Sequence, residues 1–379
     1  MSELQPFKNY YNEEMAWRLG GMVAQVYPAF DVQAFVAQVR PQLPPLELKE
    51  RIAVFSQALH DHLPQDYPQA VEILLALLGP TLHEEEGMFN DGWHMMPLAH
   101  FVEVYGLEHF EVSVRAMKEI TQRHSSEFTI RPFLVRYPDA MLAVLHEWVH
   151  DESFHVRRLV SEGTRPRLPW GMRLHQFVKD PTPTLALLEH LKDDPSEYVR
   201  RSVANHLNDI TKDHPDLVLM TVRRWREGAS QGTNWLIRHA LRSLVKAGHP
   251  QALALLGYGE ATVSLVDFQV QPAQIELGQS VTFTFTLRND AAAAQDLLID
   301  YVVYYVKANG STSPKVFKLN TRTVAPGETI TIQKKHPIKP ITTRVHYPGT
   351  HTIAIQVNGQ NLGGSTFELT NVLSTTSFR

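Results

Sequence analysis

The hydrophobic period of this chain changes once, near residue 258, and that change divides the sequence into two parts. Before it, apolar residues recur at spacings of three and four, as in 70–78 (AVEILLALL), which is typical of amphipathic helices. After it the spacing becomes two, most clearly in 280–287 (SVTFTFTL), and Gly and Pro turns separate β-rich segments. We therefore predict a helical domain over residues 1–257 and a β domain over residues 258–379.

The second part has the pattern of a small β-sandwich. Further β-rich segments are expected at 297–306, 316–324, 329–332 and 350–357. Six or seven short strands in about 120 residues are typical of an immunoglobulin-like fold. The chain contains no Cys, so the disulfide of that fold is absent here, and thiolate metal sites and Cys nucleophiles are excluded. The lack of Cys fits a reducing cytoplasm, and no signal peptide or membrane-spanning segment is expected.

The helical part contains a loose internal repeat. The segment 155–160 (HVRRLV) returns 43 residues later as 198–203 (YVRRSV), and a weaker copy, LIRHA, lies at 236–240. Repeats of about 40 residues with two helices each are the signature of HEAT or armadillo solenoids. Such stacks present an extended surface for a partner, so a non-enzymatic scaffold that binds DNA or protein is one open interpretation.

The net charge of −4 hides an uneven distribution. Residues 1–150 are acidic, whereas residues 151–257 and 301–350 carry an excess of Lys and Arg. Local basic patches govern the binding of polyanions more than the total charge does. Two basic surfaces that only face solvent are the alternative explanation.

Polar residues at helical spacing lie within the repeat segments. Arg158 and Glu162 are four residues apart, and Arg201, Asn205 and Asp209 continue the same spacing in the next copy. A separate apolar stripe is expected to pack into the solenoid, so these polar lines could face one shared groove. The alternative is an ordinary ion pair on a helix surface, worth a few tenths of a kcal/mol.

Three longer motifs resemble a known family. The segments 161–171 (SEGTRPRLPWG) and 198–216 (YVRRSVANHLNDITKDHPD) resemble the AlkC branch of the AlkD-like bacterial DNA alkylation-repair glycosylases. The segment 335–349 (KHPIKPITTRVHYPG) resembles the immunoglobulin-like domain that one AlkC subgroup carries. The resemblance covers most of the chain and rests on motifs more specific than a HEAT pattern.

The resemblance implies a function. Members of this family are monofunctional glycosylases of base excision repair for cationic methylated bases, especially 3-methyladenine and 3-methylcytosine. It implies a HEAT-like cradle around bent double-stranded DNA without a deep pocket for a flipped base, unlike most enzymes that act on bases. We expect a bacterial cytoplasmic protein that is a monomer, has no obligate protein partner and does not associate with a membrane. We expect no metal ion or organic cofactor.

The same motifs supply candidate catalytic residues. Asp209 and Glu162 match the family's active-site carboxylates, Trp170 matches the adjacent aromatic residue, and Glu127, in 125–131 (SSEFTIR), matches a third acidic position. A base methylated at N3 is a good leaving group, and its departure leaves an oxocarbenium-like sugar. A carboxylate stabilises that cation and orients or deprotonates water; we assign this role first to Asp209. Trp170 could stack on the sugar or the lesion.

Basic residues near these motifs are the candidate contacts to DNA phosphates. In the helical part they are Arg157, Arg158, Arg165, Arg167, Arg200, Arg201, Lys212 and Arg238. In the β part they are Lys335, Lys339 and Arg344. Some must instead pair with nearby carboxylates, and the basic residues of the β part could simply protect a strand edge from aggregation.

A short motif favours a different enzyme class. His146, Glu147 and His150 fit the H-E-x-x-H pattern of zinc peptidases. The pattern has three fixed positions and sits where a repeat helix should end, so His150 could instead complement the negative end of that helix. The peptidase is the least favoured of the three functions.

Overall fold

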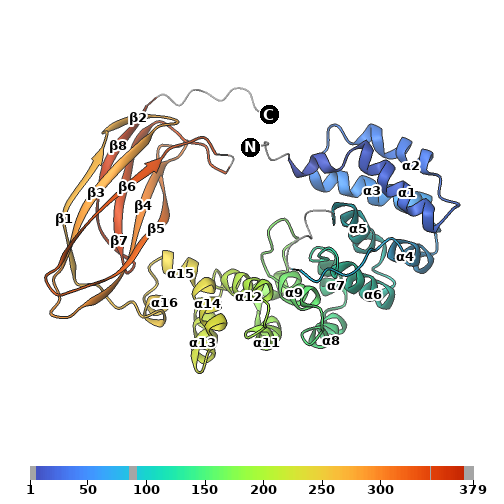
Figure 1. Cartoon of the computed structure of the whole chain (residues 1–379), viewed down its shortest axis with the longest axis horizontal. Helices are drawn as coiled ribbons and strands as arrows, with labels where there is room; N and C mark the ends of the chain where they lie inside the picture. Colours follow the sequence, from blue (N-terminus) through green and yellow to red (C-terminus); the bar gives the residue numbers. More distant parts are fainter. Residues whose placement is uncertain (1–5, 85–91, 342, 371–379) are drawn as a thin grey trace. The chain divides into compact units, whose positions relative to one another are not determined.

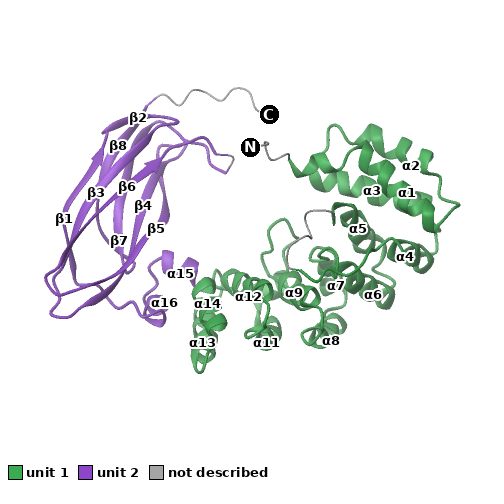
Figure 2. Ribbon diagram, in the orientation of Figure 1, with its two compact units in different colours: residues 1–240 green, residues 241–379 purple. Residues whose placement is uncertain are grey.

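The computed structural model describes residues 6–84, 92–341 and 343–370, which form two compact units. The first unit covers Met1–Ala240 and the second Leu241–Arg379 (Figure 2). No helix within the described ranges is long and apolar enough to cross a membrane.

The first unit is helical throughout its described part. Its α-helices are α1 (Glu13–Val26), α2 (Val32–Val39), α3 (Leu48–His62), α4 (Tyr67–Leu75), α5 (Met96–Tyr105), α6 (Phe110–Thr121), α7 (Ile130–Arg136), α8 (Pro138–Trp148), α9 (Phe154–Gly163), α10 (His175–Lys179), α11 (Thr182–Leu191), α12 (Glu197–Ile210), α13 (Pro215–Arg226) and α14 (Gln231–Ala240). Short 3-10 turns are η1 (Phe7–Tyr10), η2 (Arg40–Gln42) and η3 (Gly92–Met95).

Local sequence signals set where several of these helices begin. The side chains of Asn12, Asp31 and Asp66 each accept a hydrogen bond from a backbone N–H in the first turn of the helix that follows. These caps satisfy N–H groups that the helix itself leaves unpaired. Pro138 and Pro215 occupy first helical positions, where proline lacks only an N–H that would have no intrahelical partner.

The internal repeat corresponds to stacked helices. Its three copies lie on α9, α12 and α14, which follow one another in one row, while α8, α11 and α13 form a second row (Figure 1). On α12 the stripe of Val199, Val203 and Leu207 is completely buried. The stacked helix pairs that the repeat predicts are therefore confirmed.

The second unit begins with two short helices and continues as a β-sandwich. The elements are α15 (Arg242–Lys246), α16 (Pro250–Leu255), β1 (Val263–Gln271), β2 (Gln274–Glu276), β3 (Ser280–Asn289), β4 (Gln295–Val306), β5 (Thr312–Val324), β6 (Thr329–Pro337), β7 (Gly349–Val357) and β8 (Gln360–Thr370). Within the described residues, one sheet has the order β1-β3-β6 and the other β2-β8-β7-β4-β5. Phe283, Phe285, Ile353, Ile355 and Phe367 are among the buried residues of the core between them. The immunoglobulin-like sandwich is confirmed.

The change from helix to strand and the division into compact units fall at different positions. Helix α16 ends at Leu255 and β1 begins at Val263, around the expected boundary of 257/258. The compact units divide earlier, after Ala240, because the segment with α15 and α16 packs on the β7–β8 turn. There Gln356 donates a hydrogen bond to the Lys246 carbonyl.

Two glycines allow this close approach. A Cβ atom added at Gly359 would lie 2.5 Å from the Cα atom of Gly248, and both glycines have positive φ angles, 82° and 74°. A side chain at either position would therefore meet both a backbone clash and an unfavourable backbone conformation.

We expect Gly359→Ala to destabilise the second unit more than Gly278→Ala does. Gly278 also has a positive φ, but a Cβ atom there would meet no heavy atom within 4 Å. The clash at Gly359 should lower the free energy of unfolding by roughly 1–3 kcal/mol beyond the conformational cost that both variants share. Urea unfolding of the two variants measures the difference, and equal losses would contradict the packing of this segment on the turn.

Candidate functional site

Five charged side chains form a chain of alternating charge, which we call the charge ladder: Glu127, Arg158, Glu162, Arg165 and Asp209. Arg158 Nη1 lies 2.9 Å from Glu127 Oε2, and Arg158 Nη2 lies 3.6 Å from Glu162 Oε1. Arg165 Nη1 lies 2.7 Å from Glu162 Oε1, and its Nε donates to Asp209 Oδ2 at 2.8 Å. Each guanidinium group is thus shared by two carboxylates.

The packing of the repeats brings these residues together. Arg158 and Glu162 are one turn apart on α9, and Arg165 follows that helix directly. Asp209 lies in the last turn of α12, which packs against α9, and Glu127 precedes α7. The structure therefore unites the three carboxylates that the family resemblance singled out.

The ladder is buried from Glu162 to its end at Asp209. Glu162, Arg165 and Asp209 expose 6%, 7% and 3% of their surfaces. Buried charges require partners, since an isolated ion loses its hydration. Ser202 supplies a further one by donating to Glu162 Oε2 at 2.6 Å.

The electrostatics keep Glu162 ionised. Burial by itself raises the pKa of this carboxyl, but the guanidinium groups of Arg158 and Arg165 outweigh burial and hold the pKa below its ordinary value. The middle of the ladder is therefore a carboxylate near neutral pH, surrounded by fixed donors.

The groove expected along the polar lines differs from what the structure shows. Asp209 does lie off the apolar stripe of α12, but it is as buried as that stripe. Arg158 and Arg201 occupy equivalent repeat positions with different surroundings. Arg201 pairs with Glu197 on the surface, whereas Arg158 lies within the ladder and over the ring of Tyr198, 4.7 Å from its centroid. Arg158 belongs to the site because it pairs both with Glu162 on its own helix and with Glu127, which precedes α7.

The segment that carries Trp170 is held by two cations that the sequence did not single out. The guanidinium group of Arg131, which is completely buried, donates to the carbonyls of Gly163 and Met172. Burial, together with the nearby charge of Arg165, lowers the pKa of Arg131 to about 10. Lys49 Nζ donates to the carbonyl of Trp170 itself. Trp170 has a φ of 64°, a conformation that a bulky residue keeps only when its surroundings fix it.

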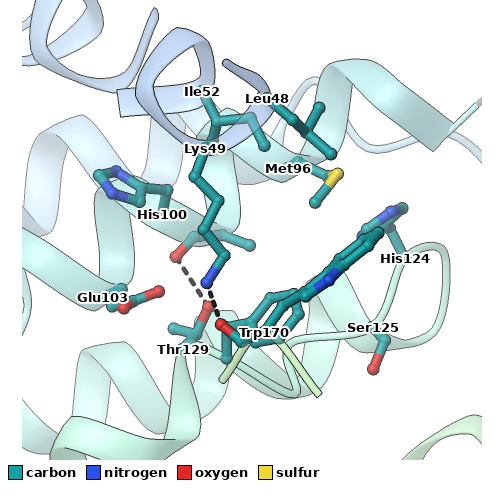
Figure 3. A pocket seen from close by; sticks show the side chains of 12 residues that line it. Leu48, Lys49, Ile52, Met96, His100, Glu103, His124, Ser125, Thr129 and Trp170 are labelled. Atoms are coloured by element: carbon teal, nitrogen blue, oxygen red, sulfur yellow. Dashed lines mark hydrogen bonds between the residues drawn. The ribbon is translucent and has the colours of Figure 1, made fainter. Parts of the chain in front are cut away.

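Trp170 is 67% exposed and borders two adjoining pockets, which together we call the Trp170 cavity. Figure 3 shows one of these two pockets. The walls come from α3, α5 and the segment 124–129. Glu127 also lines the cavity, so this end of the ladder and Trp170 face a common space.

Several Arg residues proposed as phosphate contacts are engaged inside the protein. Arg157 forms an ion pair with Asp194 and also donates to the carbonyls of Asp151 and Glu152. Arg158 and Arg165 belong to the ladder. Arg200 donates to the Asp194 carbonyl. These side chains are bound to carboxylates and to backbone carbonyls of the protein rather than free to contact phosphates.

The remaining candidates lie nearer the surface. Arg167 is paired with Asp213, 2.7 Å away. Lys212 is about half exposed and reaches Asp209 Oδ1 at 3.0 Å, and Arg238 is exposed on α14. In the second unit Lys335, on β6, and Lys339, after it, are exposed. Arg344 lies 3.8 Å from the centroid of the Tyr305 ring.

Some of the newly found residues were visible in the sequence motifs and others were not. Arg131 and Ser202 stand within the segments 125–131 and 198–203, but spacing alone gave neither a role. Lys49 lies far from any motif in the sequence, and only the fold places it beside Trp170.

The residues of the H-E-x-x-H pattern lie apart from the ladder, on and just after α8. His146 and His150 are exposed, and their rings lie 6.4 and 5.1 Å from the ring of His190 on α11. Within the described ranges, no group of three or more His, Asp or Glu side chains is placed to hold a metal ion. The peptidase interpretation gains no support from this arrangement.

The chain is similar to proteins of DNA alkylation repair. A family model described as "DNA alkylation repair enzyme" matches residues 114–244, and one described as "Uncharacterised protein YhaZ, C-terminal Ig-like domain" matches residues 264–371. Uncharacterized protein YhaZ of Bacillus subtilis (strain 168) is 40% identical over 355 residues, which cover 93% of this chain and 96% of that protein.

A solved structure extends the similarity to both units. It is the Pseudomonas fluorescens alkylpurine DNA glycosylase AlkC bound to DNA containing an abasic site analog. It is 42% identical, covers 97% of this chain and 100% of its own, and has a TM-score of 0.91.

We expect Arg158→Met to destabilise the first unit far more than Arg201→Met. The first variant removes the guanidinium group shared by Glu127 and Glu162 and leaves the buried Glu162 with Arg165 and Ser202 as partners, at a cost of roughly 2–3 kcal/mol in the free energy of unfolding. The second removes a surface ion pair between exposed side chains, where little change is expected. Chemical denaturation of both variants provides the comparison.

The difference in the free energy of unfolding between the wild type and Arg158→Met should also depend on pH. Because the pKa of Glu162 is lowered by folding, its ion pairs contribute fully above the pKa of an unfolded Glu, about 4.3. This contribution is lost as the pH falls through the lower folded value. The stability gap should therefore narrow in acid, and a gap that stays constant into strong acid would contradict the electrostatic role of Arg158.

Proposed function

Because this chain belongs to the AlkC-type DNA alkylation repair enzymes, which are DNA glycosylases, we propose that it excises 3-methyladenine and 3-methylcytosine from double-stranded DNA. The observation that carries the proposal is the charge ladder, in which three carboxylates from separate elements meet around two guanidinium groups. Two of the cations paired with these carboxylates are largely buried guanidinium groups, but the third, Lys212, is about half exposed, so the negative charge of Asp209 is available to a substrate once Lys212 moves away.

The reaction needs little besides this charge. A base methylated at N3 carries a positive charge and leaves without protonation, so the catalytic problem is the cation that develops on the sugar. Asp209 and Glu162 supply preorganised negative charge for that cation. Glu127, at the more open end of the ladder, is the candidate to orient or deprotonate the attacking water. The face of Trp170 stacks on the sugar or the lesion.

Asp209 also has a route to the substrate. Of the partners that the structure gives it, Arg165 is buried, but Lys212 is about half exposed and covers Oδ1. A DNA phosphate competes for the Lys212 ammonium group, since phosphate contacts dominate protein–DNA binding. Movement of Lys212 to the backbone of DNA would expose Oδ1 of Asp209 while Arg165 keeps the carboxylate in place.

The contacts to DNA are assigned to the exposed basic residues. In the first unit these are Arg201, Lys212 and Arg238, and in the second they are Lys335 and Lys339. Each such contact positions the duplex without reading its sequence. Arg158 and Arg165 instead pair with the carboxylates of the ladder, and Arg157 binds the turns that precede α9 and α12.

We expect Asp209→Asn to lower the rate of base excision by roughly 10²–10³-fold or more while DNA binding is retained. Asn keeps the shape of the side chain but removes its charge. Because Asp209 is 3% exposed and bound to Arg165, some stability will also be lost, so excision must be compared per folded molecule. Single-turnover excision from methylated DNA and a binding titration measure the two effects.

Asp213→Asn is the matched control. Asp213 lies one turn further along and is also paired with an Arg of the segment 161–171, but at the surface. The Asp213→Asn variant should excise methylated bases at a rate close to that of the wild type. Equal losses in the two variants would contradict the role of Asp209, and a wild-type protein that binds DNA without releasing any base would favour the scaffold function.

We expect the double substitution Lys335→Gln and Lys339→Gln to weaken DNA binding and to flatten its dependence on salt. Each phosphate contact contributes about 0.9 to the slope of log K against log salt, so the slope should fall by roughly 1–2. The charge-matched control is Lys307→Gln with Lys318→Gln, at exposed positions of the other sheet and its turn. If the slope of log K against log salt is unchanged in the variant with Lys335→Gln and Lys339→Gln, these two residues do not contact DNA.

A further inference from the structure

The Trp170 cavity has the composition of a site for a flat, uncharged molecule. The apolar residues that its two pockets share are Leu48, Met96, Phe128 and Trp170. The two pockets also share the polar residues His124 and Ser125, and Trp93 adds a further aromatic residue to one of them. The larger pocket has a volume of about 290 Å³, near the lower end of the roughly 300–1,000 Å³ typical of sites for small molecules.

A few polar groups stand among these apolar walls. Lys49 Nζ lies 5.0 Å from the centroid of the Phe128 ring and reaches the Trp170 carbonyl (Figure 3). Glu103 and His100 lie on the same side of the cavity. Burial raises the pKa of Glu103 and lowers that of His100, and the charge of Lys49 lowers both. A small number of donors and acceptors in an apolar pocket fixes the orientation of a ligand.

The cavity adjoins the place where the base would be released. Glu127 lines it and is the outer carboxylate of the charge ladder, and Trp170 forms its lip with 67% of its surface exposed. The outer carboxylate of the ladder and the aromatic residues Phe128 and Trp170 therefore line the same pocket.

Base excision changes the charge of the base. When the bond between C1′ and the base nitrogen breaks, its electron pair stays on the base and cancels the positive charge of the methylated ring. The oxygen of water bonds to C1′, and its proton passes to a carboxylate or to solvent. The cationic base is attracted to the ladder, whereas the freed neutral base is not, and an apolar aromatic pocket then binds it better than the ladder does.

We propose that the Trp170 cavity is a product site that binds the excised methylated base in its neutral form. This inference rests on the proposed glycosylase function, because that function supplies the ligand. Its consequence is inhibition by product: free 3-methyladenine binds the protein and slows the release of further base from methylated DNA.

The test uses free 3-methyladenine as the probe and the full-length protein. Calorimetric titration should detect its binding, and its addition should lower the initial rate of base release. Leu48→Phe fills the cavity from the half-buried first turn of α3, so it should weaken binding of the free base by about tenfold or more. It should also relieve the inhibition.

Val104→Phe is the matched control. Val104 is 48% exposed on α5, beside Glu103, and does not line the cavity, so binding and inhibition should both persist in this variant. Since Leu48→Phe adds its bulk at a half-buried position, thermal melting will establish that both variants are folded.

The outcomes separate the product site from the glycosylase function. Normal release of bases from methylated DNA, with no binding of 3-methyladenine and no inhibition, would overturn the product site alone. Binding that Leu48→Phe leaves unchanged would place the base elsewhere and would also overturn it. If the base binds in the cavity but no base is released from DNA, the binding site stands and the glycosylase function fails.

Discussion

The shared guanidinium groups of Arg158 and Arg165 are the interaction on which the site depends. Without them Glu127, Glu162 and Asp209 would be neighbouring carboxylates in a poorly hydrated environment, where repulsion and burial would favour protonation of at least one. With them, three carboxylates are held in place as a preformed set of negative charges. In the proposed reaction this charge would stabilise the sugar cation that develops as the methylated base leaves.

The same principle extends from the carboxylates to the backbone around them. Buried Arg131 binds the carbonyls on either side of the segment 164–171, and Lys49 binds the carbonyl of Trp170. These cations fix a non-glycine residue in a left-handed conformation with its ring exposed. The site therefore combines a buried group of ion pairs with an aromatic side chain that is exposed to solvent, and cations hold both in place.

The sequence predicted features that lie within one helix or strand, and it missed contacts between side chains of different helices. The repeats located α9, α12 and α14, and strict alternation located β3, because these signals lie within one element. Strand β8 was not predicted, since Gly363 and Gly364 interrupt its alternation. Spacing on one helix could relate Arg158 to Glu162, but the partners across helices, which make Arg165 part of the ladder rather than a surface residue, arise only when α9 and α12 pack. The family motifs supplied the three carboxylates and Trp170 without their geometry.

The most direct test of the account is the chromatographic identification of bases released from DNA that has been treated with a simple methylating agent. We predict that the protein releases 3-methyladenine and 3-methylcytosine, the bases whose positive charge matches the charge ladder, and leaves unmethylated bases in the DNA. If folded protein that binds this DNA releases neither base, the charge ladder is a structural ion-pair network and the glycosylase assignment for this site is wrong.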